Sequence, residues 1–200
     1  MTAIDISETF INTLQRKVKE QQLDIEVIHA NVLTQPLNSY FDGAFCMGNS
    51  FGYFPYEKMN LFVKKISDVL KPGGNWITNT GLAAESFLAN YIHEKKYELG
   101  DLTMHIRNDY DSWHSCLLTT LTYTKNNLQE IQRFKSYVYT VAEIIRLLKK
   151  QRLKTIALYS STDKTVYLLG GTQLFLVAQK ESYIFFTCLL KKIRLLQQPS

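Results

Sequence analysis

The chain has 200 residues, 46% of them hydrophobic and 12% aromatic, which is enough for one buried core and argues against a disordered protein. Its net charge of +5 is a mild basic excess, mostly within residues 146–154 and 191–194, so no nucleic-acid partner is expected. Cys46, Cys116 and Cys188 lack the paired spacing of a zinc site or a disulfide framework, and residues 1–10 lack the pattern of a signal peptide. We therefore expect a cytoplasmic protein with reduced thiols and no metal site.

The first residues predict a strand, a helix and a second strand. Residues 2–6 form a short β-type run, and Ser7 is a good N-cap for a helix whose apolar side chains recur at helical spacing. Residues 24–31 alternate acidic and apolar residues and end in a turn, which predicts the next strand.

Residues 41–54 are the stretch around which the chain is organised. Ala44 to Met47 form an apolar run, and Gly48 and Gly52 then permit backbone conformations that other residues resist, so a buried strand breaks into a loop. Residues 56–70 carry an amphipathic helical stripe, and a Pro-Gly-Gly turn leads to another strand at 76–80. Ligands of open α/β sheets bind outside the carboxyl ends of the strands, so chemistry is expected at Met47 to Tyr53.

The pattern changes to period two between residues 99 and 138. A helix is predicted over 83–91, followed by antiparallel strands at 102–107, 116–123 and 131–138 with turns at 108–112 and 125–128. A helix from Thr140 and two strands at 155–159 and 172–178 complete the predicted elements.

Four features of this order resemble one protein family. Asp42 at the head of a strand, GNSFGYF at its end, an amphipathic helix and then VLKPGG before the next strand resemble the second half of a class I S-adenosylmethionine (SAM)-dependent methyltransferase domain of the small-molecule type. The resemblance implies a Rossmann-like, doubly wound α/β fold with strand order three, two, one, four, five, seven, six and a terminal antiparallel hairpin. It implies a domain over residues 1–181, with residues 99–138 as an inserted β meander above the substrate site.

The same resemblance implies an enzyme that transfers a methyl group from SAM to a small-molecule acceptor. In this alignment Asp5 ends the family's second strand, so the first strand and its glycine-rich turn would precede Met1. We expect an N-terminally truncated chain, with an apolar strand and a Gly-x-Gly turn encoded just upstream. Without that strand, the facing edges of its two neighbours would stay unpaired unless they closed on each other. A non-catalytic remnant or interaction module is the alternative.

The resemblance also implies which residues contact the cofactor. Asp5 would accept hydrogen bonds from the ribose, although an aspartate before a helix can also be a simple cap. Asn31 stands where the family offers an aspartate to the adenine, and its amide oxygen can still accept a hydrogen bond. The expected cofactor residues are Asp5, Ile6, Asn31, Val32, Met47, Gly48 and Asn49.

The acceptor side is expected to draw on the loop after residue 47 and on the meander, and no catalytic residue is assigned. The candidates are Ser50, Tyr53, Arg107, Tyr110, Trp113 and His114. The alternative for the turn residues is simple exposure to solvent. The Asn/Asp-Pro-Pro-aromatic motif that reads nucleobase amino groups is missing, which argues against a DNA amino-methyltransferase.

Residues 182–200 lie beyond the expected domain. The segment 182–196 is apolar and basic, too short and too charged to span a bilayer. We expect a packed or disordered tail, with peripheral membrane contact as the alternative.

Overall fold

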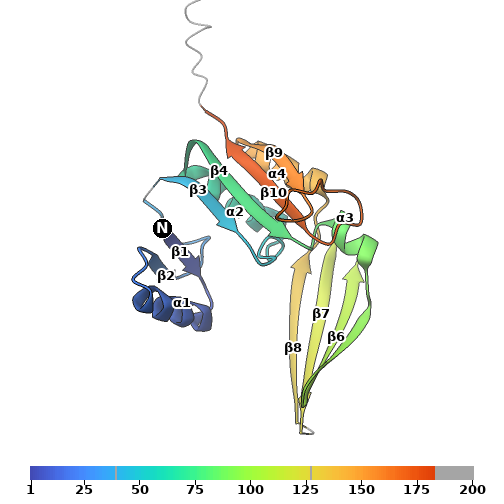
Figure 1. Ribbon diagram of the computed structural model, residues 1–200. Coiled ribbons are helices and arrows are strands. Elements are labelled where there is room, and N and C mark those ends of the chain that lie inside the picture. The colour runs from blue at the N-terminus through green and yellow to red at the C-terminus, as the bar shows by residue number, and fades with distance from the viewer. Residues whose placement is uncertain (39, 127, 183–200) are drawn as a thin grey trace, which may run out of the picture.

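The computed structural model describes residues 1–38, 40–126 and 128–182 (Figure 1). The predicted tail at 182–200 therefore lies outside the described residues except for Ser182. The elements are β1 (Thr2–Asp5), α1 (Glu8–Glu20), β2 (Glu26–His29), β3 (Phe41–Cys46), α2 (Tyr56–Val69), β4 (Leu70–Thr80), α3 (Ala84–Phe87), η1 (Leu88–Asn90), β5 (Glu94–Leu99), β6 (Leu102–Asp111), β7 (Cys116–Lys125), β8 (Leu128–Tyr137), α4 (Val141–Lys150), β9 (Leu153–Tyr159) and β10 (Leu174–Lys180). No helix among these described residues is long and apolar enough to cross a membrane.

The strands form three separate sheets. β1 pairs in parallel with β2, a mixed sheet has the order β3-β4-β10-β9, and an antiparallel sheet has the order β5-β6-β7-β8. The predicted α/β class and the terminal antiparallel hairpin of β9 and β10 are confirmed. The expected doubly wound sheet is divided into two, because none of the described strands lies side by side with both β1 and β3 and joins them into one sheet. Their facing edges do not close on each other.

Two helices cover one face of the mixed sheet. The stripe predicted for α2 buries Met59, Phe62 and Val63. Helix α4 begins with a capping box, in which the Thr140 side chain accepts from the Glu143 backbone N–H and the Glu143 carboxylate accepts from the Thr140 N–H. The side chains of α2 and α4 meet those of β4, β9 and β10 in one core around Trp76, which is fully buried.

The opposite face of the mixed sheet is largely open. Phe45 is 67% exposed on β3, Ile77 is 41% exposed on β4 and Ile156 is 50% exposed on β9. Phe45 and Ile77 are direct neighbours in the parallel pairing. Large exposed apolar side chains on a sheet with an unpaired edge favour association with other chains.

Two predicted boundaries around β4 are wrong. The strand begins at Leu70 rather than Trp76, and the Pro-Gly-Gly segment forms an irregularity within it, since Phe41 pairs with Leu70 but Gly43 pairs with Asn75. Gly73 has φ +81, so the chain still turns there, as its glycines predict. The helix predicted over 83–91 is only α3 and η1, because the chain leaves helical geometry at Tyr91 (φ −63, ψ 124).

The β meander differs from its prediction in two ways. It has four strands, because β5 at Glu94–Leu99 precedes the expected start at residue 99. β6 also runs on to Asp111, so the turn lies at 112–115 rather than 108–112. Arg107 and Tyr110 are therefore strand residues.

The open face of the mixed sheet predicts an aggregation-prone protein. Replacing Phe45 by lysine should slow aggregation, because a charge on an edge strand opposes pairing with another chain. The measurement is light scattering of the purified chain against time at fixed concentration. Leu61→Lys is the matched control, since Leu61 is 55% exposed on α2, away from the sheet edge. Equal rates for both variants would contradict the prediction.

Candidate functional site

The loop after β3 is bound to the carboxyl end of β4. The Gly48 N–H donates to Asn79 Oδ1 at 2.9 Å, and the Gly81 N–H donates to Asn49 Oδ1 at 2.6 Å. Thr80 Oγ1 donates to the Phe51 carbonyl at 3.1 Å. The backbone of residues 48–51 is therefore fixed where two strands of the mixed sheet end.

Phe51 is the anchor of this loop. It is 1% exposed, and its ring lies 6.1 Å from that of Trp76 and 6.2 Å from that of Tyr139. With Phe51 held in the core, the residues on either side of it are exposed: Met47 at 44% and Tyr53 at 55%. The loop thus presents two predicted site residues to solvent.

Two other predicted residues of the loop have internal hydrogen bonds. Asn49 has φ +64, and its amide oxygen is used by Gly81, so its first role is to hold the loop. Ser50 Oγ donates to the Met47 carbonyl at 3.1 Å. The sequence analysis did not identify Asn79, near the end of β4, or Gly81, directly after β4. These two residues are the hydrogen-bond partners of Gly48 and Asn49.

Gly52 connects the loop to the meander. Its carbonyl accepts from the Tyr137 N–H at 2.7 Å, directly after which Val138 pairs with Ser115. Gly52 has φ +129, and a Cβ there would lie 3.0 Å from the Tyr137 carbonyl oxygen and 3.0 Å from Leu82 Cδ1. Only glycine can adopt this φ and also leave room for these two atoms. Through Gly52, Tyr137 and Val138, backbone hydrogen bonds thus form a bridge from the loop to the turn at 112–115.

That turn contains an Asp–His pair. His114 Nδ1 lies 2.6 Å from Asp111 Oδ2, and Asp111 Oδ1 accepts from the backbone N–H groups of Trp113 and His114. The hydrogen bond from His114 is the main reason that the pKa of the Asp111 carboxyl lies below its ordinary value. The ionised carboxylate is an acceptor only, so Nδ1 carries the proton and neutral His114 has its lone pair on Nε2. Asp111 was missed in the sequence, although its spacing of three residues from His114 within a turn was a usable signal.

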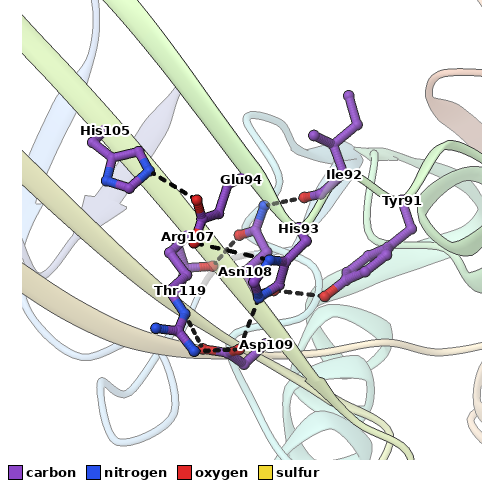
Figure 2. Close-up of polar contacts among 9 residues, drawn as sticks. All are labelled: Tyr91, Ile92, His93, Glu94, His105, Arg107, Asn108, Asp109 and Thr119. Atoms are coloured by element: carbon purple, nitrogen blue, oxygen red, sulfur yellow. Dashed lines mark hydrogen bonds and ion pairs between the residues drawn. The ribbon is translucent and has the colours of Figure 1, made fainter.

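The remaining meander residues divide into two groups. Tyr110 lies beside the turn, with its hydroxyl 3.2 Å from Ser115 Oγ and its ring 6.3 Å from that of Phe87, and Trp113 is 94% exposed. Arg107 is different, because it contacts Asp109 at 3.2 Å on the part of β6 that projects from the core (Figure 2). The structure therefore gathers Tyr110, Trp113 and His114 and does not bring Arg107 to them.

The residues predicted to hold the ribose and adenine lie at the carboxyl ends of β1 and β2. Asp5 is exposed, and its Oδ1 accepts from the Ser7 N–H at 2.7 Å, which is the cap role considered as the alternative. Ile6 is 69% exposed, and its carbonyl lies 3.0 Å from His29 Nε2. Asn31 Oδ1 accepts from the Leu33 N–H at 2.9 Å, so one of its lone pairs is already used.

A cavity of about 240 Å³ borders Asp5. Its other lining residues, between β1 and α1, are Ala3, Ile4, Phe10, Ile11 and Leu14. Val32 packs against the core of the mixed sheet and connects this unit to it. Among the described residues, no hydrogen bond joins Asp5 or Asn31 to the loop at 47–53, and no cluster of three metal-ligating side chains occurs. The cofactor residues thus form two groups on two sheets.

The geometry of Gly52 predicts a stability effect. Gly52→Ala should lower the free energy of unfolding by about 1–3 kcal/mol, because the added Cβ meets a backbone oxygen in a conformation closed to other residues. Gly48→Ala is the control: Gly48 has φ +76 but open space around it, so its cost should be only about 1 kcal/mol. Denaturant unfolding measures both, and an equal cost for the two variants would contradict the assignment of Gly52 as the bridge.

Comparisons with known proteins agree with this arrangement. A family model described as a methyltransferase domain matches residues 1–74. A comparison with curated protein sequences found no match.

Solved structures share the fold. An S-adenosylmethionine-dependent methyltransferase from Clostridium acetobutylicum matches with a TM-score of 0.79 and 14% identity over 90% of this chain and 75% of its own. The CcbJ methyltransferase from Streptomyces caelestis matches with a TM-score of 0.79 and 11% identity over 90% and 74%. The sugar N-methyltransferase KedS8 from Streptoalloteichus matches with a TM-score of 0.69 and 16% identity over 90% and 71%. The chain thus has the fold of these methyltransferases, and its residues 1–74 match the methyltransferase domain model.

Proposed function

We propose that this protein transfers a methyl group from SAM to a small molecule that carries a nucleophilic nitrogen or oxygen. The observation that carries the proposal is the Asp111–His114 pair, held through Ser115, Val138, Tyr137 and Gly52 beside the loop at the carboxyl ends of β3 and β4. A base at this edge of the sheet lies where ligands of open α/β sheets bind. The pair gives His114 a defined proton-accepting nitrogen.

The described residues fit the nucleoside portion of SAM. Asp5 is exposed and uses one carboxylate oxygen for Ser7, which leaves the other for a ribose hydroxyl. Asn31 retains acceptor capacity for the adenine amine. Met47, Gly48 and Asn49 lie nearest to where the methionine portion is expected, after β3. No described strand between β1 and β3 adds backbone donors to that side.

The chain's task in the reaction is alignment and proton removal. Bound SAM supplies an electrophilic methyl group on a sulfonium. The acceptor atom attacks that carbon, the carbon–sulfur bond breaks, S-adenosylhomocysteine leaves, and the acceptor's proton passes to His114 Nε2. Asp111 holds the imidazole ring and stabilises the cation that results. Tyr53 and Trp113, both exposed, would contact the acceptor.

An amine is the acceptor class to test first. Among solved proteins with this fold, KedS8 is a sugar N-methyltransferase and CalS10 from Micromonospora echinaspora is an amino pentose methyltransferase. Amino sugars are therefore the first panel for a screen with methyl-labelled SAM. The cytoplasm is the proposed compartment, in keeping with the free thiols of Cys46 and Cys116.

The alternative is a non-catalytic, methyltransferase-like module. The observation behind it is the divided sheet, since the two groups of cofactor residues lie on separate sheets. Absence of SAM binding in calorimetry with the purified chain would favour this alternative and remove the enzymatic proposal for the 200-residue chain.

Asp5 provides the direct test of the cofactor site. Asp5→Asn keeps an oxygen for the Ser7 N–H but removes the charge. A hydrogen bond to a charged group is worth about 1.5–3 kcal/mol, so the SAM dissociation constant should rise about ten-fold to a hundred-fold. Asp24→Asn, which also removes one carboxylate near the N-terminal unit, should leave it unchanged. Equal affinity for the Asp5 variant would remove Asp5 from the site.

The Asp–His pair predicts a loss of rate without a loss of binding. With an acceptor found in the screen, His114→Gln and Asp111→Asn should each lower kcat by about 10²-fold, the lower end for general base catalysis. The SAM dissociation constant should not change. Glu94→Gln is the control, because Glu94 also contacts a histidine, His105, but pairs with Arg107, four residues away from Asp111 along β6. If kcat were unchanged in both the His114 and the Asp111 variant, His114 would not be the general base, and catalysis would come only from the alignment of the two substrates.

A further inference from the structure

The mixed sheet carries a cluster of basic side chains at the edge away from the candidate site. β10 runs antiparallel to both β4 and β9, so the end of β10 lies beside Asn75 of β4 and Lys154 of β9. In Figure 1, β10 ends at the edge of the mixed sheet away from the meander. The paired part of β4 from Asn75 to Thr80 has a length of about 20 Å, which separates this edge from the loop at 47–53.

An open cavity of about 460 Å³ lies at this edge. Arg152, Lys154 and Lys180 line it, together with one carboxylate, that of Glu181. Three cations and one anion give the lining an excess of positive charge. The volume lies within the range of small-molecule sites, which is about 300–1,000 Å³.

The basic side chains reach the cavity from both faces of the sheet. Lys154 is directly opposite Gln179 in the antiparallel pairing, so these two exposed side chains share a face. Lys180 is opposite Leu153, which is buried, and therefore lies on the face that the helices cover. Arg152 lies between α4 and β9, directly before Leu153.

Lys180 is held in position by α2. Its ammonium group donates to Ser67 Oγ, and Ser67, which is 2% exposed, donates to the Gln151 carbonyl at 2.6 Å. An ammonium group has three N–H donors. Within the part of the chain that the structure describes, Ser67 is its one hydrogen-bond acceptor, so the other two donors are left for a ligand.

The surroundings of Lys180 favour a bound anion. Burial is the main reason that the pKa of Lys180 lies below its ordinary value, and Arg152 and Lys64 lower the pKa further, whereas Asp68 raises it. Burial and like charges both oppose the ammonium form. An anion in the cavity would offset this cost by attracting the ammonium group.

The two lysines of the cavity differ from their neighbours in having no acidic partner. Lys64 pairs with Asp68, and Lys71 pairs with Asp42. Among the described residues, neither Lys154 nor Lys180 forms an ion pair. Their charges are therefore not neutralised by the described chain.

We propose that this cavity binds the diphosphate group of a small molecule, at a site separate from the one proposed for methyl transfer. Arginine binds phosphate oxygens as a planar fork and lysine binds them as a point charge. A diphosphate carries more charge than a carboxylate and spreads its oxygens over two phosphorus atoms, which suits cations that approach from two faces. None of the described side chains that line the cavity is apolar, so the charged group is the part of the ligand that is recognised.

The backbone at the start of β4 leaves room for such a ligand. Gly73 lines the cavity, and a Cβ at this position would meet nothing within 4 Å. Its carbonyl accepts from Gln179 Nε2 at 3.1 Å, which joins the end of β10 to this segment. The wall formed by Gly73 and Gln179 is thus fixed before a ligand binds.

The experiment is calorimetric titration of the full chain with inorganic pyrophosphate at low salt, in which we expect saturable binding. Lys154→Gln and Lys180→Gln should each weaken it about ten-fold, because each removes a hydrogen bond between a charged donor and a charged acceptor. The glutamine amide can still donate to Ser67, and Lys154 is exposed, so both variants should fold. Lys19→Gln is the matched control, because Lys19 is also exposed but lies on α1. It should bind pyrophosphate as the wild type does.

A change of the opposite sign tests the charge of the lining. Glu181→Gln should tighten pyrophosphate binding about three-fold, because it removes the one carboxylate of the cavity. Glu130→Gln, at an exposed position on β8, should leave it unchanged.

Four results would overturn the proposal. They are the absence of saturable pyrophosphate binding, equal effects of the Lys154 and Lys19 variants, citrate binding as tight as that of pyrophosphate, and binding to vesicles of phosphatidylserine and phosphatidylcholine without binding of free pyrophosphate. The SAM dissociation constant of Lys154→Gln is measured in parallel. It should equal that of the wild type, since a separate site lies about 20 Å from the loop at 47–53; a raised value would contradict the separation of the two sites.

Discussion

The structure depends on β4 more than on any other strand. It pairs in parallel with β3 and antiparallel with β10, so it joins the nucleotide-fold half of the mixed sheet to the closing hairpin. Its Trp76 lies at the centre of the core, and the side chains of Thr78, Asn79 and Thr80 each hydrogen-bond the chain between Cys46 and Phe51. A displacement of β4 would therefore move the loop at 47–53 and the core. It would also move the meander, because the Gly52 carbonyl in this loop accepts a hydrogen bond from the Tyr137 N–H at the end of β8.

The parts of the fold that were predictable from sequence are those with a strong period. The stripe of Met59, Phe62 and Val63 in α2 recurs at helical spacing and is buried as predicted. The apolar run at 44–47 did indicate a strand, but the expectation that it is buried is wrong, because no residue of β3 is buried and Phe45 is 67% exposed. β5 was missed because Glu94, Lys95, Lys96 and Glu98 give it no apolar pattern; it is a strand only because β6 supplies the partner. A turn was wrongly expected at 108–112, where Asn108 and Asp109 are typical turn residues. In the sheet, Asn108 accepts from Thr119 and Asp109 contacts His93 and Arg107, so both are satisfied in extended backbone.

The candidate site shows the same division. The loop at 47–53 was predictable, because Gly48 and Gly52 follow an apolar run and permit the backbone conformations with which a chain leaves a strand. Its rigidity was not, since the partners Asn79 and Gly81 lie about thirty residues away and their contact depends on the strand pairing. His114 was found as an exposed polar residue in a turn, whereas its pairing with Asp111 required the true position of that turn. Asp5 and Asn31 were predicted as cofactor residues from their order in the chain, and each uses one side-chain oxygen to accept a hydrogen bond from a backbone N–H two residues further on.

The position of β10 has a consequence for how the protein forms during synthesis. β10 lies between β4 and β9, yet it is the last of these strands to leave the ribosome. The hairpins of β5 to β8 join neighbours in sequence and can form early, because little chain entropy is lost in closing them. β4 must wait for residues 174–180, about a hundred positions later, before its second edge is paired. For that interval the nascent chain exposes β4 and β9 as open strand edges, and this is the period in which a chaperone would be of most use to it.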